Sequence, residues 1–308
     1  MSKYRILIMS VGEYAKNYTA RYLAKIDGVD KSTIVLPSVF ESNAESYKKH
    51  GFDVYIYDEK KYINGEFEFF GLKPRNCGGV GRQGVAECIE HFGKDYDGYY
   101  VLDDDYSALF VRKYDVKTEK WKQTSIDSND DLLDVIGGLD NFCKKTGILA
   151  GGSTANIIPS RGSSGKNFTS YKLFNNFLMY SGRKANFDGF KALTNDDYRY
   201  NMFLNYQQNI PLMSLLRLSI SSVNSQGVRK DGNAVIYNTD LSWKKAYALK
   251  LMSPASASLY LKKVKTNNMW QFKEKHNYKL VGPPILLRDD ETGKIDRVVV
   301  FNKKENIL

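Results

Sequence analysis

Three consecutive carboxylates, Asp103, Asp104 and Asp105, directly follow the apolar segment at residues 99–102. Like charges held this close repel one another, and burial strengthens the repulsion. A divalent cation removes that cost, and Mg²⁺ or Mn²⁺ prefers such oxygen ligands, which it usually shares with phosphates. Because side chains alternate along an extended segment, Asp103 and Asp105 are predicted to bind one metal ion. Asp104 points the other way, toward a sugar or ribose hydroxyl. The alternative is a solvated acidic turn.

A glycine-rich turn at residues 75–81 precedes a predicted helix over residues 82–92. Glycines permit close approach of the backbone to a ligand, and a helix N-terminus beside arginines favours an anion such as a diphosphate. We therefore expect Arg75, Gly81, Arg82 and Gln83 to contact phosphate. The turn lacks the Gly-Lys-Ser/Thr of a P-loop and the spacing of a dinucleotide fingerprint. An ordinary strand-to-helix turn is the alternative.

Two further features could complete a catalytic site. Asp196 and Asp197 open a predicted helix over residues 195–208. Acids at such a position either cap the helix or, as a general base, take a proton from an acceptor hydroxyl. His276 lies among lysines and is either a surface residue or a third metal ligand beside the aspartates.

Alternating strand and helix patterns must position these groups. Strands are predicted at residues 4–10, 32–36, 54–57, 99–102 and 148–150, the last stopping at Gly151-Gly152, and helices at 13–26, 42–50, 82–92 and 130–145. This order predicts an α/β fold with a mostly parallel sheet flanked by helices, in which ligands bind at the carboxyl ends of the strands. Residues 113–130 are expected to form a hairpin or loop. The C-terminal half is less regular, with a strand at 214–219 and a helix at 240–252. We expect one domain over residues 1–308, with donor chemistry in 1–150 and acceptor contacts in 151–308.

Composition limits the class of protein. The chain has 308 residues, of which 42% are hydrophobic, so a packed core is expected. Its three cysteines show no paired spacing, which indicates reduced thiols and a cytoplasmic location. No signal peptide or membrane-spanning segment is predicted, and nothing indicates an obligate protein partner.

The net charge of +10 is concentrated in two segments. Residues 241–280 contain nine lysines against one acid, Glu274, and residues 161–191 contain a second basic group. Such a surface either binds a polyanion, of which nucleic acid is the common one, or is a solvated lysine face. If the polyanion is DNA, as the resemblance described next implies, the residues assigned to its contact are Arg161, Lys166, Arg183, Lys244, Lys245, Lys262, Lys263 and Lys265.

The order of these features resembles that of nucleotide-sugar glycosyltransferases of the GT-A fold. Within that fold, the chain looks most similar to phage glycosyltransferases that modify 5-hydroxymethylpyrimidine bases in DNA, relatives of the kinetoplastid base J glucosyltransferase. The similarity lies in the segments GVGRQGVAE, YYVLDDDYSALF and TNDDYRYN and covers roughly residues 4–210.

The resemblance implies a UDP-sugar donor, a hydroxymethylated pyrimidine in double-stranded DNA as acceptor, and Mn²⁺ or Mg²⁺ as cofactor. It implies a metal site at Asp103, Asp105 and His276, and a general base at Asp197 or Asp196. A phage protein would act in the host cytoplasm. The implied donor contacts are Ser10, Val11, Gly12, Arg75, Gly81, Arg82, Gln83, Asp103, Asp104, Gly151 and Gly152.

One departure from the family leaves the stereochemistry of transfer open. The chain has Asn195-Asp196-Asp197 where many inverting members have Glu-Asp. Two other functions also stay open: transfer to a protein or polysaccharide acceptor, and non-catalytic binding of nucleic acid by a basic protein.

Overall fold

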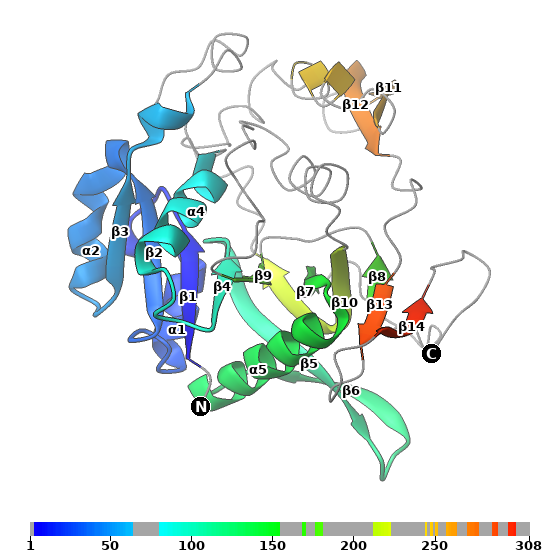
Figure 1. Cartoon of the computed structure of the whole chain (residues 1–308). Coiled ribbons are helices and arrows are strands. Elements are labelled where there is room, and N and C mark those ends of the chain that lie inside the picture. Colours follow the sequence, from blue (N-terminus) through cyan, green and yellow to red (C-terminus); the bar gives the residue numbers. More distant parts are fainter. Residues whose placement is uncertain are drawn as a thin grey trace.

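The computed structural model describes the N-terminal half of the chain almost completely. The described residues are 3–63, 80–154, 168–170, 176–180, 212–222, 244, 247–248, 250–251, 257–263, 270–276, 285–288 and 295–299. Within these ranges the chain forms an α/β structure, a mixed sheet flanked by helices (Figure 1).

Four parallel strands form the first half of the sheet, as the sequence predicts. They are β1 (Tyr4–Met9), β2 (Ser32–Pro37), β3 (Asp53–Tyr57) and β4 (Gly98–Leu102), in the order β3-β2-β1-β4. Every residue of β1, β2 and β4 is buried, as expected for parallel strands covered on both faces. The chain moves outward from β1 to β3 and then returns to the other side of β1. Between β1 and β4 the strand order therefore reverses, and open α/β sheets bind ligands at this point.

Six further strands extend the sheet: β5 (Tyr106–Asp115), β6 (Lys120–Ser125), β7 (Leu149–Thr154), β8 (Phe168–Ser170), β9 (Asn176–Met179) and β10 (Leu212–Ser222). Their pairing corrects the prediction of a mostly parallel sheet. β9 runs antiparallel to both β4 and β7, and β5 runs antiparallel to both β6 and β10. The turn at residues 116–119 is too short for the crossover that parallel neighbours need. Among these six strands, β7 and β10 form the one parallel pair of the described part of the chain.

Two separate hairpins follow after residue 254, in a part of the chain for which no element was predicted. β11 (Ala257–Lys263) pairs with β12 (Trp270–His276), and β13 (Ile285–Arg288) pairs with β14 (Ile295–Val299). The predicted helix over residues 240–252 is confirmed at its described positions, 244, 247–248 and 250–251. In the described part of the chain, no helix has the length and apolar character needed to cross a membrane.

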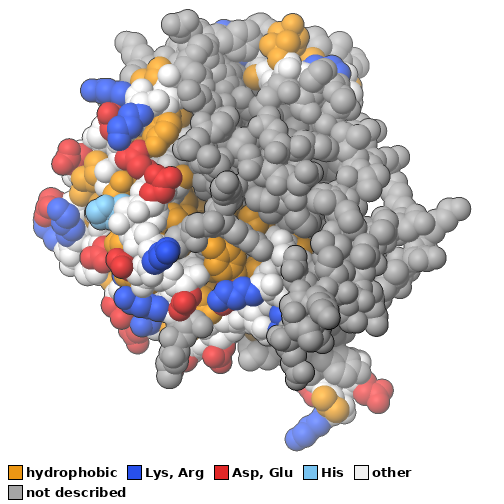
Figure 2. All heavy atoms as spheres, viewed as in Figure 1, with side chains coloured by type: hydrophobic (Ala, Val, Ile, Leu, Met, Phe, Trp, Pro, Cys, Tyr) orange, Lys and Arg blue, Asp and Glu red, His pale blue; other side chains and the backbone are white. Residues whose placement is uncertain are grey.

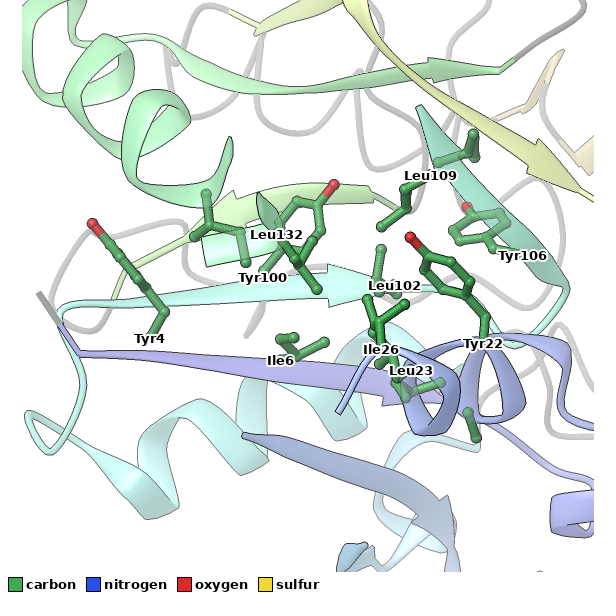
Figure 3. Packing of buried hydrophobic residues seen from close by; sticks show 14 of the residues in the cluster. Tyr4, Ile6, Tyr22, Leu23, Ile26, Tyr100, Leu102, Tyr106, Leu109 and Leu132 are labelled. Atoms are coloured by element: carbon green, nitrogen blue, oxygen red, sulfur yellow. The ribbon is translucent and has the colours of Figure 1, made fainter. Parts of the chain in front are cut away.

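Helices cover both faces of the sheet. They are α1 (Tyr18–Lys25), α2 (Ala44–Lys48), α4 (Gly81–Phe92) and α5 (Asn129–Thr146), with short 3-10 helices η1 (Tyr14–Lys16), η2 (Ser38–Asn43) and η3 (Glu59–Tyr62). Alternate side chains of β1 face two cores. Ile6 and its neighbours pack with Leu23 of α1 and Leu132 of α5 (Figure 3), whereas Leu7 packs with Val85 of α4. Burial of one such side chain contributes roughly 1.5–3 kcal/mol, so the two cores fix the edge of the sheet where the acidic residues lie.

The predicted helix over residues 13–26 is broken at Asn17, which corrects that prediction. Asn17 has extended backbone angles (φ −94°, ψ 102°), and its side chain accepts a hydrogen bond from the Ala20 amide. It therefore ends η1 and caps α1. As a result, the first amides of α1 meet the loop that follows β4, where the Tyr18 amide donates to the Asp104 carbonyl at 2.9 Å.

Two helical glycines provide a matched test of the packing between α4 and the sheet. A Cβ atom at Gly84 would lie 2.3 Å from the buried ring of Tyr57, whereas at Gly138 in α5 it would meet nothing within 4 Å. Alanine favours a helix by about 1 kcal/mol over glycine, but overpacking costs about 1–3 kcal/mol. We expect Gly84→Ala to lower the free energy of unfolding in urea and Gly138→Ala to raise it. A shift in the same direction for both variants would contradict this packing.

Candidate functional site

The three aspartates form an acidic turn, residues 103–105, between β4 and β5. It lies at the carboxyl end of β4, next to the carboxyl end of β1, because Ile8 pairs with Leu102. Asp104 is buried, with 6% of its surface exposed, whereas Asp103 and Asp105 are half-buried. The middle carboxylate of the turn is therefore more deeply buried than the two outer ones, and the binding of one metal ion by Asp103 and Asp105 stays a prediction.

A buried network of Ser10, Asn17, Tyr47 and Asp104 holds the middle carboxylate. The Ser10 hydroxyl donates to Asp104 Oδ2 at 3.0 Å and lies 3.0 Å from the Tyr47 hydroxyl. Asn17 Nδ2 donates to the Tyr47 oxygen at 3.1 Å, and this oxygen is 2.8 Å from the Gly12 carbonyl. The network thus joins the loop after β1, the start of α1, and α2 to the acidic turn.

This network uses the side chains of Ser10 and Asp104, both of which were expected to contact the nucleotide sugar. Both side chains are buried and already bonded to each other, so they fix the shape of the loop at residues 10–12. Gly12 is buried as well, and Val11 is half-buried. Contact of Asp104 with a sugar hydroxyl stays a prediction; in the structure its described side-chain donor is Ser10.

Arg82 and the two outer aspartates of the acidic turn act on the same tyrosine, Tyr106. Burial raises the pKa of Tyr106 well above its ordinary value, and the carboxylates of Asp103 and Asp105 raise it further, whereas the Arg82 guanidinium lowers it. All three charged groups are therefore within electrostatic range of the Tyr106 hydroxyl. The Arg82 side chain is buried, and its guanidinium lies 5.5 Å from the ring centre of Phe177 in β9.

The start of α4 lies against the end of β1. A Cβ atom at Gly81 would be 3.4 Å from the Met9 sulfur, which is ordinary contact, and the Gln83 side chain is buried. α4 therefore directs its N-terminus, the positive end of the helix dipole, toward the same edge of the sheet as the acidic turn. This position agrees with an anion site there. Arg75 lies outside the described residues.

Asp103 and Asp105 fit a divalent cation by their chemistry. Mg²⁺ is commonly held by one or two carboxylates together with substrate phosphates, so two half-buried aspartates at a ligand-binding edge suffice. Among the residues that the structure describes, no three His, Cys, Asp or Glu side chains form a group that could hold a metal ion. His276 ends β12 opposite Ala257 of β11, and its role as a third ligand stays a prediction.

The position of Gly151 and Gly152 differs from the expectation. The strand does not stop there, because β7 continues to Thr154. Gly151 pairs with Phe177 of β9 and with Ser214 of β10, so both glycines are buried in the interior of the sheet. Their backbone groups take part in strand pairing, and β7 reaches the edge of the sheet only after them.

Several predicted site residues lie outside the described part of the chain. They are Arg75, Arg161, Lys166, Arg183, Asp196, Asp197, Lys245 and Lys265. Of the remaining basic residues, Lys244 is helical and half-buried, and Lys262 and Lys263 end strand β11. Their assignment to a general base or to DNA contact stays a prediction.

Three residues at the site were missed by sequence reasoning: Asn17, Thr19 and Tyr47. Thr19 is buried, and its hydroxyl contacts both ends of the acidic turn. The triplet Asn17-Tyr18-Thr19 could have been recognised as a helix start, because Asn is a preferred capping residue. Tyr47 had no such signal, since a tyrosine on a short amphipathic helix usually packs in the core.

Comparison of the chain with models of known protein families and with curated proteins gave no match in either case.

The buried network predicts an unequal effect of two tyrosine substitutions. Tyr47→Phe leaves the Gly12 carbonyl and Asn17 Nδ2 without their hydroxyl partner, and an unsatisfied buried polar group costs about 1–3 kcal/mol. We expect its thermal midpoint to fall by several degrees. Tyr18→Phe alters an exposed ring and should shift the midpoint little. Equal midpoints for the two variants, measured by scanning calorimetry, would show that the network adds no stability.

Proposed function

We propose that the protein is a metal-dependent glycosyltransferase that uses a nucleotide-sugar donor, in keeping with the resemblance of its motifs. The observation that carries this proposal is the place of the acidic turn. It follows the central strand β4 beside the loop after β1, where the strand order of the sheet reverses. A diphosphate donor bound at this edge would meet the two half-buried carboxylates and the N-terminus of α4 together.

The architecture is compatible with a GT-A fold. Four parallel strands and their helices form the donor half, and the chain then continues through antiparallel strands into the C-terminal part. We infer that residues 1–150 bind the nucleotide sugar and that residues 151–308 supply the acceptor contacts.

In this proposal, Asp103 and Asp105 hold Mn²⁺ or Mg²⁺, which when bound stabilises negative charge on the diphosphate. The loop at residues 10–12, fixed by its hydrogen bonds to Tyr47 and Asp104, faces the nucleotide base. Arg82 contributes positive charge beneath the same edge.

Transfer breaks the bond between the anomeric carbon and the diphosphate oxygen, and the acceptor oxygen forms the new bond to that carbon. Asp197 or Asp196 takes the proton of the acceptor hydroxyl. The nucleoside diphosphate leaves with the electrons of the broken bond. His276 is proposed as a further metal ligand.

The acceptor that we propose is a 5-hydroxymethylpyrimidine in double-stranded DNA. On the face shown in Figure 2, acidic and basic side chains are intermingled over the described N-terminal part. Residues 241–280, by contrast, carry nine lysines against one acid, so the excess positive charge belongs to the proposed acceptor half. Contacts of lysines with phosphates would be independent of sequence and sensitive to salt.

Substitution of the outer carboxylates tests the metal site. We expect Asp103→Asn and Asp105→Asn each to reduce sugar transfer by a factor on the order of 100 or more, because metal ligation supplies several kcal/mol of charge stabilisation. Both variants should stay folded, since each removes one of three crowded like charges. Asp30→Asn, at an exposed carboxylate beside Lys31, is the control and should transfer normally. Wild-type activity in the Asp103 and Asp105 variants would refute the metal site.

The reaction itself is tested by release of UDP from a panel of UDP-sugars with Mn²⁺, with and without hydroxymethylated duplex DNA. We expect one sugar to be used and release to require the modified DNA. Chelation of the metal should stop release. Slow release at the same rate with and without DNA would support glycosyltransferase activity and contradict the DNA acceptor. Absence of both UDP release and donor binding would contradict the proposed enzyme activity.

Substitution of several lysines within residues 241–280 distinguishes a DNA acceptor from a protein or polysaccharide acceptor. Transfer to DNA should then fall steeply and lose part of its salt dependence, as expected when phosphate contacts are removed. A protein or polysaccharide acceptor predicts little change in transfer to that acceptor.

A further inference from the structure

A single threonine hydroxyl closes the acidic turn. Thr19 Oγ1 donates to the carbonyl of Asp103 at 2.5 Å and accepts from the amide of Tyr106 at 3.0 Å. In a simple four-residue turn, these two backbone groups would bond directly to each other. Here the hydroxyl of a distant residue is inserted between them, so the width of the turn is set by the position of Thr19.

Thr19 can hold the width of the turn constant because its side chain is buried and its conformation is restricted. Its surface is fully buried, and the Tyr106 amide, which is also buried, has this hydroxyl as a hydrogen-bond partner. A β-branched side chain in a helix is restricted in its χ1 angle. The Thr19 amide also approaches the Asp104 carbonyl at 3.4 Å, beside the stronger bond from Tyr18.

The helix that carries Thr19 is itself anchored. Asn17 caps α1 and bonds to Tyr47, Leu23 packs in the core, and the Tyr22 hydroxyl donates to the Ile126 carbonyl at 2.7 Å. α1 therefore cannot shift relative to the turn without breaking several buried contacts. The repulsion among the three adjacent carboxylates tends to widen the turn, and the bonds to this anchored helix resist that widening.

We propose that Thr19 is a positioning residue of the metal site, which holds Asp103 and Asp105 at the separation that one divalent cation requires. This inference rests on the proposed function, because it assigns a purpose to the geometry of the same acidic turn. Loss of the hydroxyl leaves the Asp103 carbonyl and the buried Tyr106 amide without their bridge and allows the charged turn to widen. The outer carboxylates then no longer converge on one ion.

The test compares Thr19→Val, which keeps the shape and removes the hydroxyl, with Thr19→Ser, which keeps the hydroxyl. Binding of Mn²⁺ in the presence of UDP is measured by electron paramagnetic resonance of the free ion. We expect Thr19→Val to weaken Mn²⁺ binding by about 10–100-fold, as for outer partners of metal ligands, and Thr19→Ser to bind within about threefold of the wild type.

Thr146 provides a matched control. Its buried hydroxyl makes the same kind of bridge, donating to the Phe142 carbonyl at 2.7 Å and accepting from the Ile148 amide at 3.3 Å. It precedes β7, whose first residue lies at the opposite edge of the sheet from the acidic turn. Thr146→Val should therefore lose stability comparably and bind Mn²⁺ like the wild type.

The outcomes separate the two proposals. If the wild type binds Mn²⁺ and Thr19→Val binds it equally well, or if Thr146→Val loses as much affinity as Thr19→Val, the positioning role is overturned and the proposed function is untouched. If the wild type with UDP binds no Mn²⁺, the metal site and the role of Thr19 fall together. Should Thr19→Val not fold, Thr19→Cys replaces it, because a thiol fills the same space and is a weak donor and acceptor. An intermediate loss of affinity is then expected, and wild-type affinity would overturn the role.

Discussion

The repulsion among three adjacent carboxylates at the end of a buried strand is the constraint on which the rest of this site depends. Such an arrangement is unfavourable unless other groups hold the backbone and compensate the charge. In this protein the backbone is held by α1, whose first amides and Thr19 hydroxyl bond to the acidic turn. Arg82 is buried, and its positive charge opposes the effect of Asp103 and Asp105 on the pKa of Tyr106. The interruption between η1 and α1 at Asn17 makes these bonds possible, because it leaves the first amides of α1 available to the turn.

The inward orientation of Asp104 links two parts of the site that the sequence presents separately. Its carboxylate accepts from Ser10, the first residue after β1, and Ser10 also accepts from the Gly12 amide. The loop after β1 and the acidic turn are therefore tied together by hydrogen bonds, of which the one to the Asp104 carboxylate is stronger than a bond between neutral groups. If the loop faces the base of a nucleotide and the turn faces its diphosphate, the fixed distance between loop and turn sets the length of the nucleotide that fits between them.

The sequence predicted the parts of the fold that obey a single local rule. Strands β1 to β4 are short apolar runs with turn residues between them, and β-branched residues such as those at 33–35 mark them clearly. The mixed direction of the later strands could not be predicted, because β9 takes its place between β4 and β7 through long-range pairing alone. Gly151 and Gly152 were misinterpreted for a related reason. Glycine usually ends a strand, but here it continues one in the sheet interior beside Phe177. At the site, the type and place of the aspartates were predictable, whereas the Thr19 bridge joins residues far apart in sequence and has no local signal.

Arg82 and the three aspartates allow a charge count for the described part of the proposed metal site. A buried guanidinium is costly unless negative charge compensates it, and the charges of Arg82, Asp103 and Asp105 all act on the Tyr106 hydroxyl. One arginine against three carboxylates leaves a formal charge of about −2 at the turn, counted as whole charges in the sense of Coulomb's law. In the proposed function, a diphosphate that approaches this edge adds further negative charge to these four residues. A divalent cation brings the formal sum at the turn to zero, and the positive end of α4 then favours the anion. The charge balance of the described residues thus favours metal and diphosphate binding together rather than either alone.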